Sequence, residues 1–159
     1  MTHLATDTAR RGVSDVQGLW LPLLQLDWKS LAVVPVGPRC SAKPFVAELP
    51  AIAQLGVVAL EVVDATGAPE RERAALAAHV GNVAAAGKRV VVAVDPPLAS
   101  VSGVSAIAIA EAAVLVATLE EVTLGEARRT LELVGRRKVI GSFTLRKERP
   151  KWTELLLRR

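Results

Sequence analysis

Five short apolar runs rich in valine and other β-formers alternate with helix-like stretches along most of this chain of 159 residues. Strands that are apolar along their whole length, with helices between them, are typical of parallel sheets covered on both faces. We therefore predict an α/β domain of three layers, α/β/α, with a parallel sheet of about five strands. The predicted strands are Leu31–Val36, Val57–Val63, Arg89–Val94, Ala113–Thr118 and Lys138–Phe143, and the predicted helices are Lys43–Leu55, Pro69–Ala86, Val101–Ala110 and Thr123–Val134.

The residues at the expected helix ends agree with this pattern. Gly56, Gly87 and Gly135 stand where helices should stop, just before strands, and glycine is the residue that most readily ends a helix. Thr123 precedes the fourth helix and Glu126 follows three residues later, which is the spacing of a capping box. Local signals and the longer apolar pattern thus predict the same elements.

Composition divides the chain into three parts. Residues 31–146 form the predicted domain, residues 1–30 an N-terminal arm or short helix, and residues 147–159 a basic C-terminal helix. Trp20 and Trp28 belong to the first part. We expect both to be buried against the domain, because a tryptophan side chain carries a large apolar area.

Charge and cysteine content indicate the setting. From residue 136 onward nine Lys/Arg stand against two Asp/Glu, a net charge of +7, whereas residues 1–135 carry eleven and fourteen, a net charge of −3. The single Cys40 allows no internal disulfide and fits a reducing compartment. We expect no secretory signal and no membrane-spanning helix, and therefore a cytoplasmic protein. His79 stands alone in a predicted helix, and we expect it at the surface.

The turn after the first predicted strand is similar to part of a phosphate-binding loop, which reads G-x-x-x-x-G-K-[ST] between a strand and a helix. The first glycine, Gly37, and the lysine, Lys43, are present. Ala42 replaces the second glycine, and Pro44 replaces the hydroxyl residue that holds Mg²⁺ and has no amide hydrogen to donate. Lys43 and Arg39 still offer positive charge, so weak anion binding stays open while Mg²⁺-dependent hydrolysis is not expected.

Further motifs follow in the second half of the chain. The sequence Asp95-Pro96-Pro97 is followed by a helix, an apolar strand ending at Thr118, a Thr-started helix rich in Arg and Leu, and a last strand. The second strand, in "VVALEVVDAT", ends near Asp64. With these features residues 31–146 resemble the bacterial tyrosine autokinases of capsule and exopolysaccharide synthesis, which belong to the MinD/ParA-like branch of P-loop ATPases. The resemblance implies a P-loop NTPase-like fold.

The chain departs from that family at the positions that carry the family's chemistry. Asp64 matches the first acidic residue of the family's second strand, but Thr66 stands in place of the second. Asp95 directly precedes the Pro-Pro pair, where the family has one residue between, and "TLRKER" after the last strand has no Asn to read a base. The family's tail is a tyrosine cluster that becomes phosphorylated. This chain contains no tyrosine, so self-phosphorylation on tyrosine is impossible.

These departures together predict a non-catalytic pseudo-kinase or pseudo-ATPase that acts as a protein-binding or regulatory subunit, with no cofactor and no metal. The resemblance implies a setting in polysaccharide synthesis and export, in the cytoplasm or peripheral to the inner membrane. It implies as partners further copies of the chain or a membrane-embedded polysaccharide regulator. The vestigial phosphate loop comprises Gly37, Arg39, Ala42, Lys43 and Pro44, and the vestigial acidic positions are Asp64 and Asp95.

Two other functions stay open. In the first, Lys43, Asp64 and Asp95 still bind ATP and Mg²⁺ as an altered switch, since both carboxylates would lie at the carboxyl ends of neighbouring parallel strands, where such sheets bind ligands. In the second, the chain is a MinD/ParA-like positioning or scaffold protein that docks on a membrane or on nucleic acid. Its basic contact surface would comprise Arg136, Arg137, Lys138, Arg146, Lys147, Arg149 and Lys151.

Overall fold

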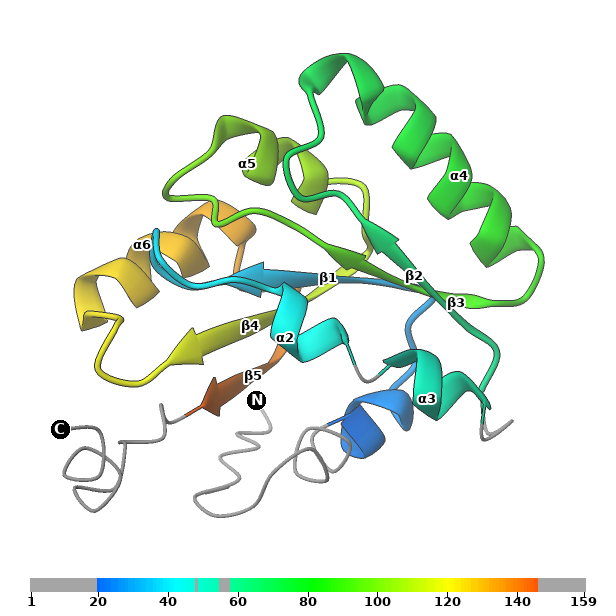
Figure 1. The fold of residues 1–159 in the computed structure, drawn as a ribbon, viewed down its shortest axis with the longest axis horizontal. Helices are drawn as coiled ribbons and strands as arrows, with labels where there is room; N and C mark the ends of the chain where they lie inside the picture. The colour runs from blue at the N-terminus through cyan, green and yellow to red at the C-terminus, as the bar shows by residue number, and fades with distance from the viewer. Residues whose placement is uncertain (1–19, 48, 55–57, 146–159) are drawn as a thin grey trace, which may run out of the picture.

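The computed structural model describes residues 20–47, 49–54 and 58–145. Its centre is a five-stranded sheet in the order β2-β3-β1-β4-β5, in which every neighbouring pair of strands is parallel (Figure 1). The predicted fold class is confirmed, and the arrangement is consistent with a P-loop NTPase-like domain. The strands are β1 (Ser30–Pro35), β2 (Leu60–Asp64), β3 (Arg89–Ala93), β4 (Ala112–Thr118) and β5 (Val139–Leu145).

Helices cover both faces of the sheet (Figure 1). A helical segment at residues 20–24, α2 (Lys43–Val46) and α3 (Leu49–Gln54) lie on one face. The other face carries α4 (Arg73–Ala85), α5 (Val101–Ile107) and α6 (Leu124–Val134), and the 3₁₀ helix η1 (Glu70–Glu72) leads into α4.

The strand order explains this division. The chain first crosses from β1 over β3 to β2, and every later connection runs back in the opposite direction. Because crossovers between parallel strands are right-handed, the first connection must lie on the face opposite to the later ones. The loop after β1 therefore leaves the sheet toward one face, while the loops after its neighbours β3 and β4 leave toward the other. Such a divergence, here called the crevice, marks the point at the carboxyl edge where parallel sheets of this kind bind ligands.

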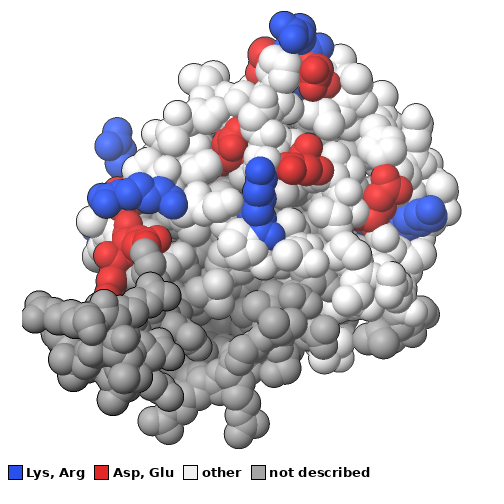
Figure 2. Space-filling view, viewed as in Figure 1, with Lys and Arg blue, Asp and Glu red and all other residues white. Residues whose placement is uncertain are grey.

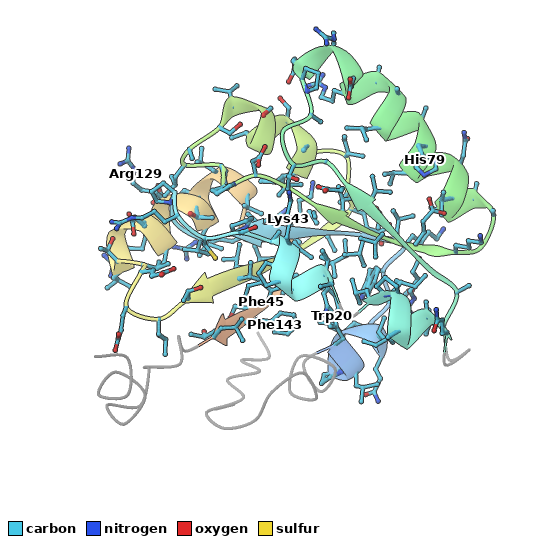
Figure 3. The ribbon with its side chains drawn as sticks, viewed as in Figure 1. Trp20, Lys43, Phe45, His79, Arg129 and Phe143 are labelled. Atoms are coloured by element: carbon cyan, nitrogen blue, oxygen red, sulfur yellow. The ribbon has the colours of Figure 1, made fainter. Side chains whose placement is uncertain are left out.

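Each face of the sheet has its own apolar core, and all six residues of β1 are buried between them. The first core is aromatic: Phe143 meets Trp20 edge-on at 5.7 Å between ring centroids and stacks with Phe45 at 6.4 Å. The second core consists of Val, Ala and Ile side chains. Trp20 and Trp28 are 0% and 2% exposed, which confirms their predicted burial. The indole Nε1 of Trp20 donates to the Phe45 carbonyl at 2.7 Å, so the segment 20–24 holds α2 in place (Figure 3).

The predicted helix Lys43–Leu55 is wrong as one element, because the structure breaks it into α2 and α3. Pro50 explains the break. A continuous helix would need the amide of residue 50 to donate four residues back, and proline has no amide hydrogen. As the second residue of α3, Pro50 occupies a position where that donor is not required.

The capping box of α6 and the glycine ends of α4 and α6 are confirmed, whereas Gly56 lies outside the described residues. The predicted helix Val101–Ala110 ends earlier, at Ile107, and the predicted helix Pro69–Ala86 begins as the 3₁₀ helix η1. The Thr123 Oγ1 accepts from the Glu126 amide at 3.2 Å and Glu126 Oε2 accepts from the Thr123 amide at 2.8 Å, which completes the capping box of α6. Gly87 and Gly135 have φ of 82° and 89° after α4 and α6. Gly103 has a different role: a Cβ there would lie 2.5 Å from the Asp95 carbonyl oxygen, so only glycine lets α5 approach this backbone.

Candidate functional site

The crevice at the carboxyl edge of the sheet brings together the loop after β1 and the ends of β2 and β3. These elements carry Lys43, Asp64 and Asp95, the residues of the expected nucleotide site. The register pairs Asp64 with Ala93, so the two carboxylates follow neighbouring strands, as predicted. Figure 3 shows Lys43 at the start of α2, above the end of the sheet. The question is whether the groups here face a ligand or one another.

The turn of residues 36–42 folds down onto β4. The Val36 amide donates to the Val116 carbonyl at 2.8 Å, and the Cys40 Sγ lies 3.6 Å from the same oxygen. Gly37 has φ of 83° and is buried against the start of α6, where a Cβ at this position would lie 3.4 Å from Val122 Cγ2 and 3.5 Å from Glu126 Oε2. A carboxylate thus lies beside the turn, and it would repel a phosphate.

The amide donors at the start of α2 already have partners. The Lys43 amide donates to Ser41 Oγ at 3.3 Å, and the Phe45 amide donates to the Ala42 carbonyl at 3.1 Å. Pro44 between them has no amide hydrogen. Ala42 is fully buried in an ordinary helical conformation, with φ of −75° and ψ of −22°. A phosphate-binding loop needs free amides that point inward at the ligand, and the amides of Lys43 and Phe45 are instead bonded within the turn.

Both vestigial carboxylates bind the turn that follows β2. Asp64 Oδ1 accepts hydrogen bonds from the amide of Thr66, at 3.0 Å, and from its hydroxyl. Asp95 Oδ2 accepts from the Gly67 amide at 2.7 Å. The Thr66 hydroxyl lowers the pKa of Asp64 below its ordinary value, and burial opposes this less strongly. The Thr66 amide and the charge of Lys43 add smaller lowering effects. Thr66 therefore acts as a hydrogen-bond donor to Asp64.

The structure thus brings Lys43 near Asp64 and joins Asp95 to the same turn. Among the residues that the structure describes, no three His, Cys, Asp or Glu side chains are grouped so that they could hold a metal ion. The cations available here are Arg39 and Lys43, both exposed in the turn, and the carboxylates of Asp64 and Asp95 are already hydrogen-bonded. That arrangement stabilises the crevice and offers little to a triphosphate.

The predicted basic contact surface is only partly within the described residues. Arg136 and Arg137 are exposed in the turn before β5, at the amino edge of the sheet. Lys138 is half-buried, its Nζ donates to the Ile107 carbonyl at 2.6 Å, and burial lowers its pKa. Lys138 is therefore engaged within the domain. The remaining members lie outside the described residues: Arg146, Lys147, Arg149 and Lys151.

Sequence reasoning missed two features of the surface. His79 is exposed, as predicted, but its Nε2 lies 2.6 Å from Glu61 Oε1 on β2, a pairing between elements that the sequence does not reveal. Arg128 and Arg129 on α6 are both exposed. Figure 3 shows Arg129 on the side of α6 that faces away from the sheet. Helical periodicity contained this signal, since the inward positions Thr130 and Val134 of α6 leave Arg128 and Arg129 outside.

No protein-family model matches the chain, and no curated protein matches its sequence. In the described part of the chain, no helix has both the length and the apolar character needed to cross a bilayer.

Proposed function

We propose that this chain is a non-catalytic P-loop ATPase-like protein, a pseudo-kinase or pseudo-ATPase, that acts as a protein-binding or regulatory subunit. One observation carries the proposal: at the start of α2 the amides are bonded within the turn or, at Pro44, missing, where a phosphate would need free donors. The Lys43 and Phe45 amides are bonded within the turn, Pro44 has none, and Cys40 and Ala42 fill the space beneath. Lys43 is left without the cradle that would position a triphosphate against it.

The resemblance described above places this role in polysaccharide synthesis and export. In that setting the chain would work in the cytoplasm, peripheral to the inner membrane, next to further copies of itself or a membrane-embedded regulator. A domain that keeps a stable sheet without a working phosphate loop retains its surfaces for binding other proteins. The proposal therefore assigns the function to the outer surfaces and gives the crevice a structural role.

One alternative rests on a specific observation. Lys43 lies close enough to Asp64 to contribute to the lowering of its pKa, so charges of both signs survive at the crevice. An altered switch would bind ATP and Mg²⁺ through these two residues and Asp95. Binding would require Asp64 and Asp95 to leave their hydrogen bonds to Thr66 and Gly67.

Thermal unfolding with nucleotide separates these functions. A ligand that binds only the folded chain raises the unfolding free energy by about 2.7 kcal/mol at a hundred times its dissociation constant, which is readily measured as a change in Tm. We expect no change in Tm with millimolar ATP or ADP, with or without Mg²⁺. The variant Lys43→Ala should behave in the same way. Its control is Lys88→Ala, which removes an exposed lysine just before β3, at the other edge of the sheet.

A rise in Tm with ATP that persists in Lys88→Ala and disappears in Lys43→Ala would overturn the proposal in favour of the altered switch.

A further inference from the structure

We infer that the outer edge of β5 is a docking site for an extended segment of a partner protein, which adds to the sheet as a further strand. The inference deepens the proposed function, on which it rests for the expectation of a protein partner. It adds the location of the contact and the chemistry of the partner, which is main-chain hydrogen bonding with apolar and hydroxyl side chains in alternation.

The first argument is the direction of the backbone groups of β5. This strand is the last in the sheet order, so in the described part of the chain it has a strand neighbour, β4, on one side only (Figure 1). The Leu145 carbonyl accepts from the Leu119 amide of the loop after β4 at 2.8 Å, so the backbone of Leu145, and of Phe143 two residues earlier, faces β4. The amides and carbonyls of Ser142 and Thr144 therefore point away from β4.

The spacing of these outward groups identifies the occupant as an extended chain. Successive outward amides and carbonyls of a strand lie two residues apart, and another strand is the element that bonds them in series. Addition of a strand to an exposed sheet edge is a recurring way for proteins to bind peptides. Ser142 and Thr144 are both exposed, so no described residue covers their side chains.

The side chains of β5 specify the sequence pattern of the partner. Phe143 belongs to the first core, and Ile140 and Leu145 pack against that core while remaining partly exposed. Ser142 and Thr144 lie on the opposite face of the sheet, because side chains alternate along a strand. A partner strand in which apolar and hydroxyl residues alternate continues both faces. Its apolar side chains cover Ile140 and Leu145, and its hydroxyl groups lie beside the two exposed hydroxyl groups of β5.

The opposite edge of the sheet provides a contrast within the same molecule. β2 carries two carboxylates in its five residues, those of Glu61 and Asp64, and charged side chains on an edge strand disfavour addition of another strand. Glu61 also contacts His79 of α4, at 2.6 Å between Oε1 and Nε2. β5 has neither a charged residue nor a proline among its seven residues. The charges that protect an edge are thus present on β2 and absent from β5.

Charge favours a partner strand over a second copy of β5. The strand is preceded by Arg136 and Arg137 and followed in the sequence by Arg146 and Lys147. An antiparallel pair of two β5 strands would place these like charges next to one another, which is destabilising. The favoured partner strand therefore has Asp or Glu at its ends.

The first measurement is amide hydrogen exchange of the full chain, followed by NMR. We expect the amides of Ser142 and Thr144 to exchange much faster than the amide of Phe143, which faces β4. Slow exchange at both residues in the chain alone would show that the edge is already covered, and would overturn the inference. This measurement needs no variant.

The second measurement is binding of a synthetic peptide in which Val and Thr alternate over about six residues, the usual length of a strand, between pairs of Glu. We expect this Val-Thr peptide to bind, to slow exchange of the Ser142 and Thr144 amides at least roughly tenfold, and to bind more weakly at high salt. The comparison peptide has Pro in place of each Val. It should not bind, because proline has no amide hydrogen and does not fit a sheet ladder.

Two proline variants locate the contact. Thr144→Pro removes an outward amide and keeps the bonds to β4, so affinity for the Val-Thr peptide should fall at least roughly tenfold. The matched control is Val62→Pro, which removes an outward amide of β2 at the opposite edge and should leave affinity unchanged. Circular dichroism and Tm establish that each variant is folded.

Three further results would overturn the inference. They are absence of binding by the Val-Thr peptide, an equal loss of affinity in both proline variants, and binding without slower exchange at Ser142 and Thr144. Slower exchange at these residues that develops with protein concentration alone would replace the partner strand with a second copy of the chain, and would overturn it as well. The proposed function fails separately, through a nucleotide-dependent Tm that these measurements do not involve.

Discussion

The turn of residues 36–44 and the side of α6 that faces away from the sheet differ in whether their polar groups are bonded within the domain. In Figure 2 basic and acidic side chains are interspersed over most of the visible face. In the turn, the amides of Lys43 and Phe45 bond to Ser41 and Ala42. On α6, Arg128 and Arg129 are exposed without an ion pair to any described residue. Groups bonded within the domain stabilise it, whereas groups that reach solvent without a partner remain available for recognition. The difference indicates that the bonded groups at the start of α2 serve the fold, while the arginines of α6 are accessible from solvent.

The largest expected effect is a loss of stability on removing the side chain of Trp20, which bonds to α2. Trp20→Ala removes a fully buried ring and its hydrogen bond to the Phe45 carbonyl, directly below α2. We expect the free energy of unfolding to fall by about 3–5 kcal/mol, measured by urea denaturation. Trp20→Phe keeps an aromatic ring against Phe143 but loses the hydrogen bond, so its cost should be smaller, about 1–3 kcal/mol. A loss below about 1 kcal/mol for the alanine variant would mean that this helix does not support the turn.

A second substitution tests the other wall of the crevice. In Gly103→Ala the new Cβ would lie 2.5 Å from the Asp95 carbonyl oxygen, so α5 or the backbone of residues 95–96 must shift. We expect a loss of about 1–3 kcal/mol in unfolding free energy. The matched control is Gly81→Ala on α4, where a Cβ meets no atom within 4 Å. There the substitution should stabilise the chain by about 0.5–1 kcal/mol, because glycine is a poor helix former. Equal effects at the two sites would contradict the close approach at Gly103.

On the inner side of α6 one substitution should raise the free energy of unfolding. Thr130 is fully buried, and its Oγ1 has no hydrogen-bond partner in the part of the chain that the structure describes. Thr130→Val replaces the hydroxyl with a methyl group of similar size, and we expect a gain of about 1 kcal/mol in differential scanning calorimetry. Thr123→Val at the N-cap should instead cost about 1 kcal/mol. If Thr130→Val lowered the stability instead, the Thr130 hydroxyl would have to contribute a hydrogen bond to the fold.

The smallest effect concerns pH at the crevice. Folding lowers the pKa of Asp64, chiefly through the Thr66 hydroxyl, so the ionised carboxylate stabilises the fold above its ordinary pKa of 3.8. That contribution is lost as the pH falls through the lower, folded-state value. We expect the wild type to exceed Asp64→Asn in stability at pH 7, by less than about 1 kcal/mol for so exposed a group, and the difference to shrink as the pH falls below 3.8. A difference that does not depend on pH would show that the charge of Asp64 contributes nothing.

The regular elements were predictable because their signals are local or periodic. The apolar run of β1 predicts a buried strand by itself, and all six of its residues are buried. The capping box of Thr123 and Glu126 is predicted from the spacing of these two residues alone. The state of the crevice was not predictable in the same way. The bond from the Gly67 amide to Asp95 joins residues 28 positions apart, and it depends on the order in which the strands are placed. The break at Pro50 could have been predicted, since proline removes a donor that a continuous helix requires.

The single thiol of this chain has a practical consequence. The Sγ of Cys40 faces the end of β4, near the Val116 carbonyl and Thr118, and its side chain is almost fully buried. We therefore expect the natural chain to react little with maleimides or thiol-specific spin labels. A cysteine introduced at an exposed position would carry the probe almost alone, with no native cysteine to remove first.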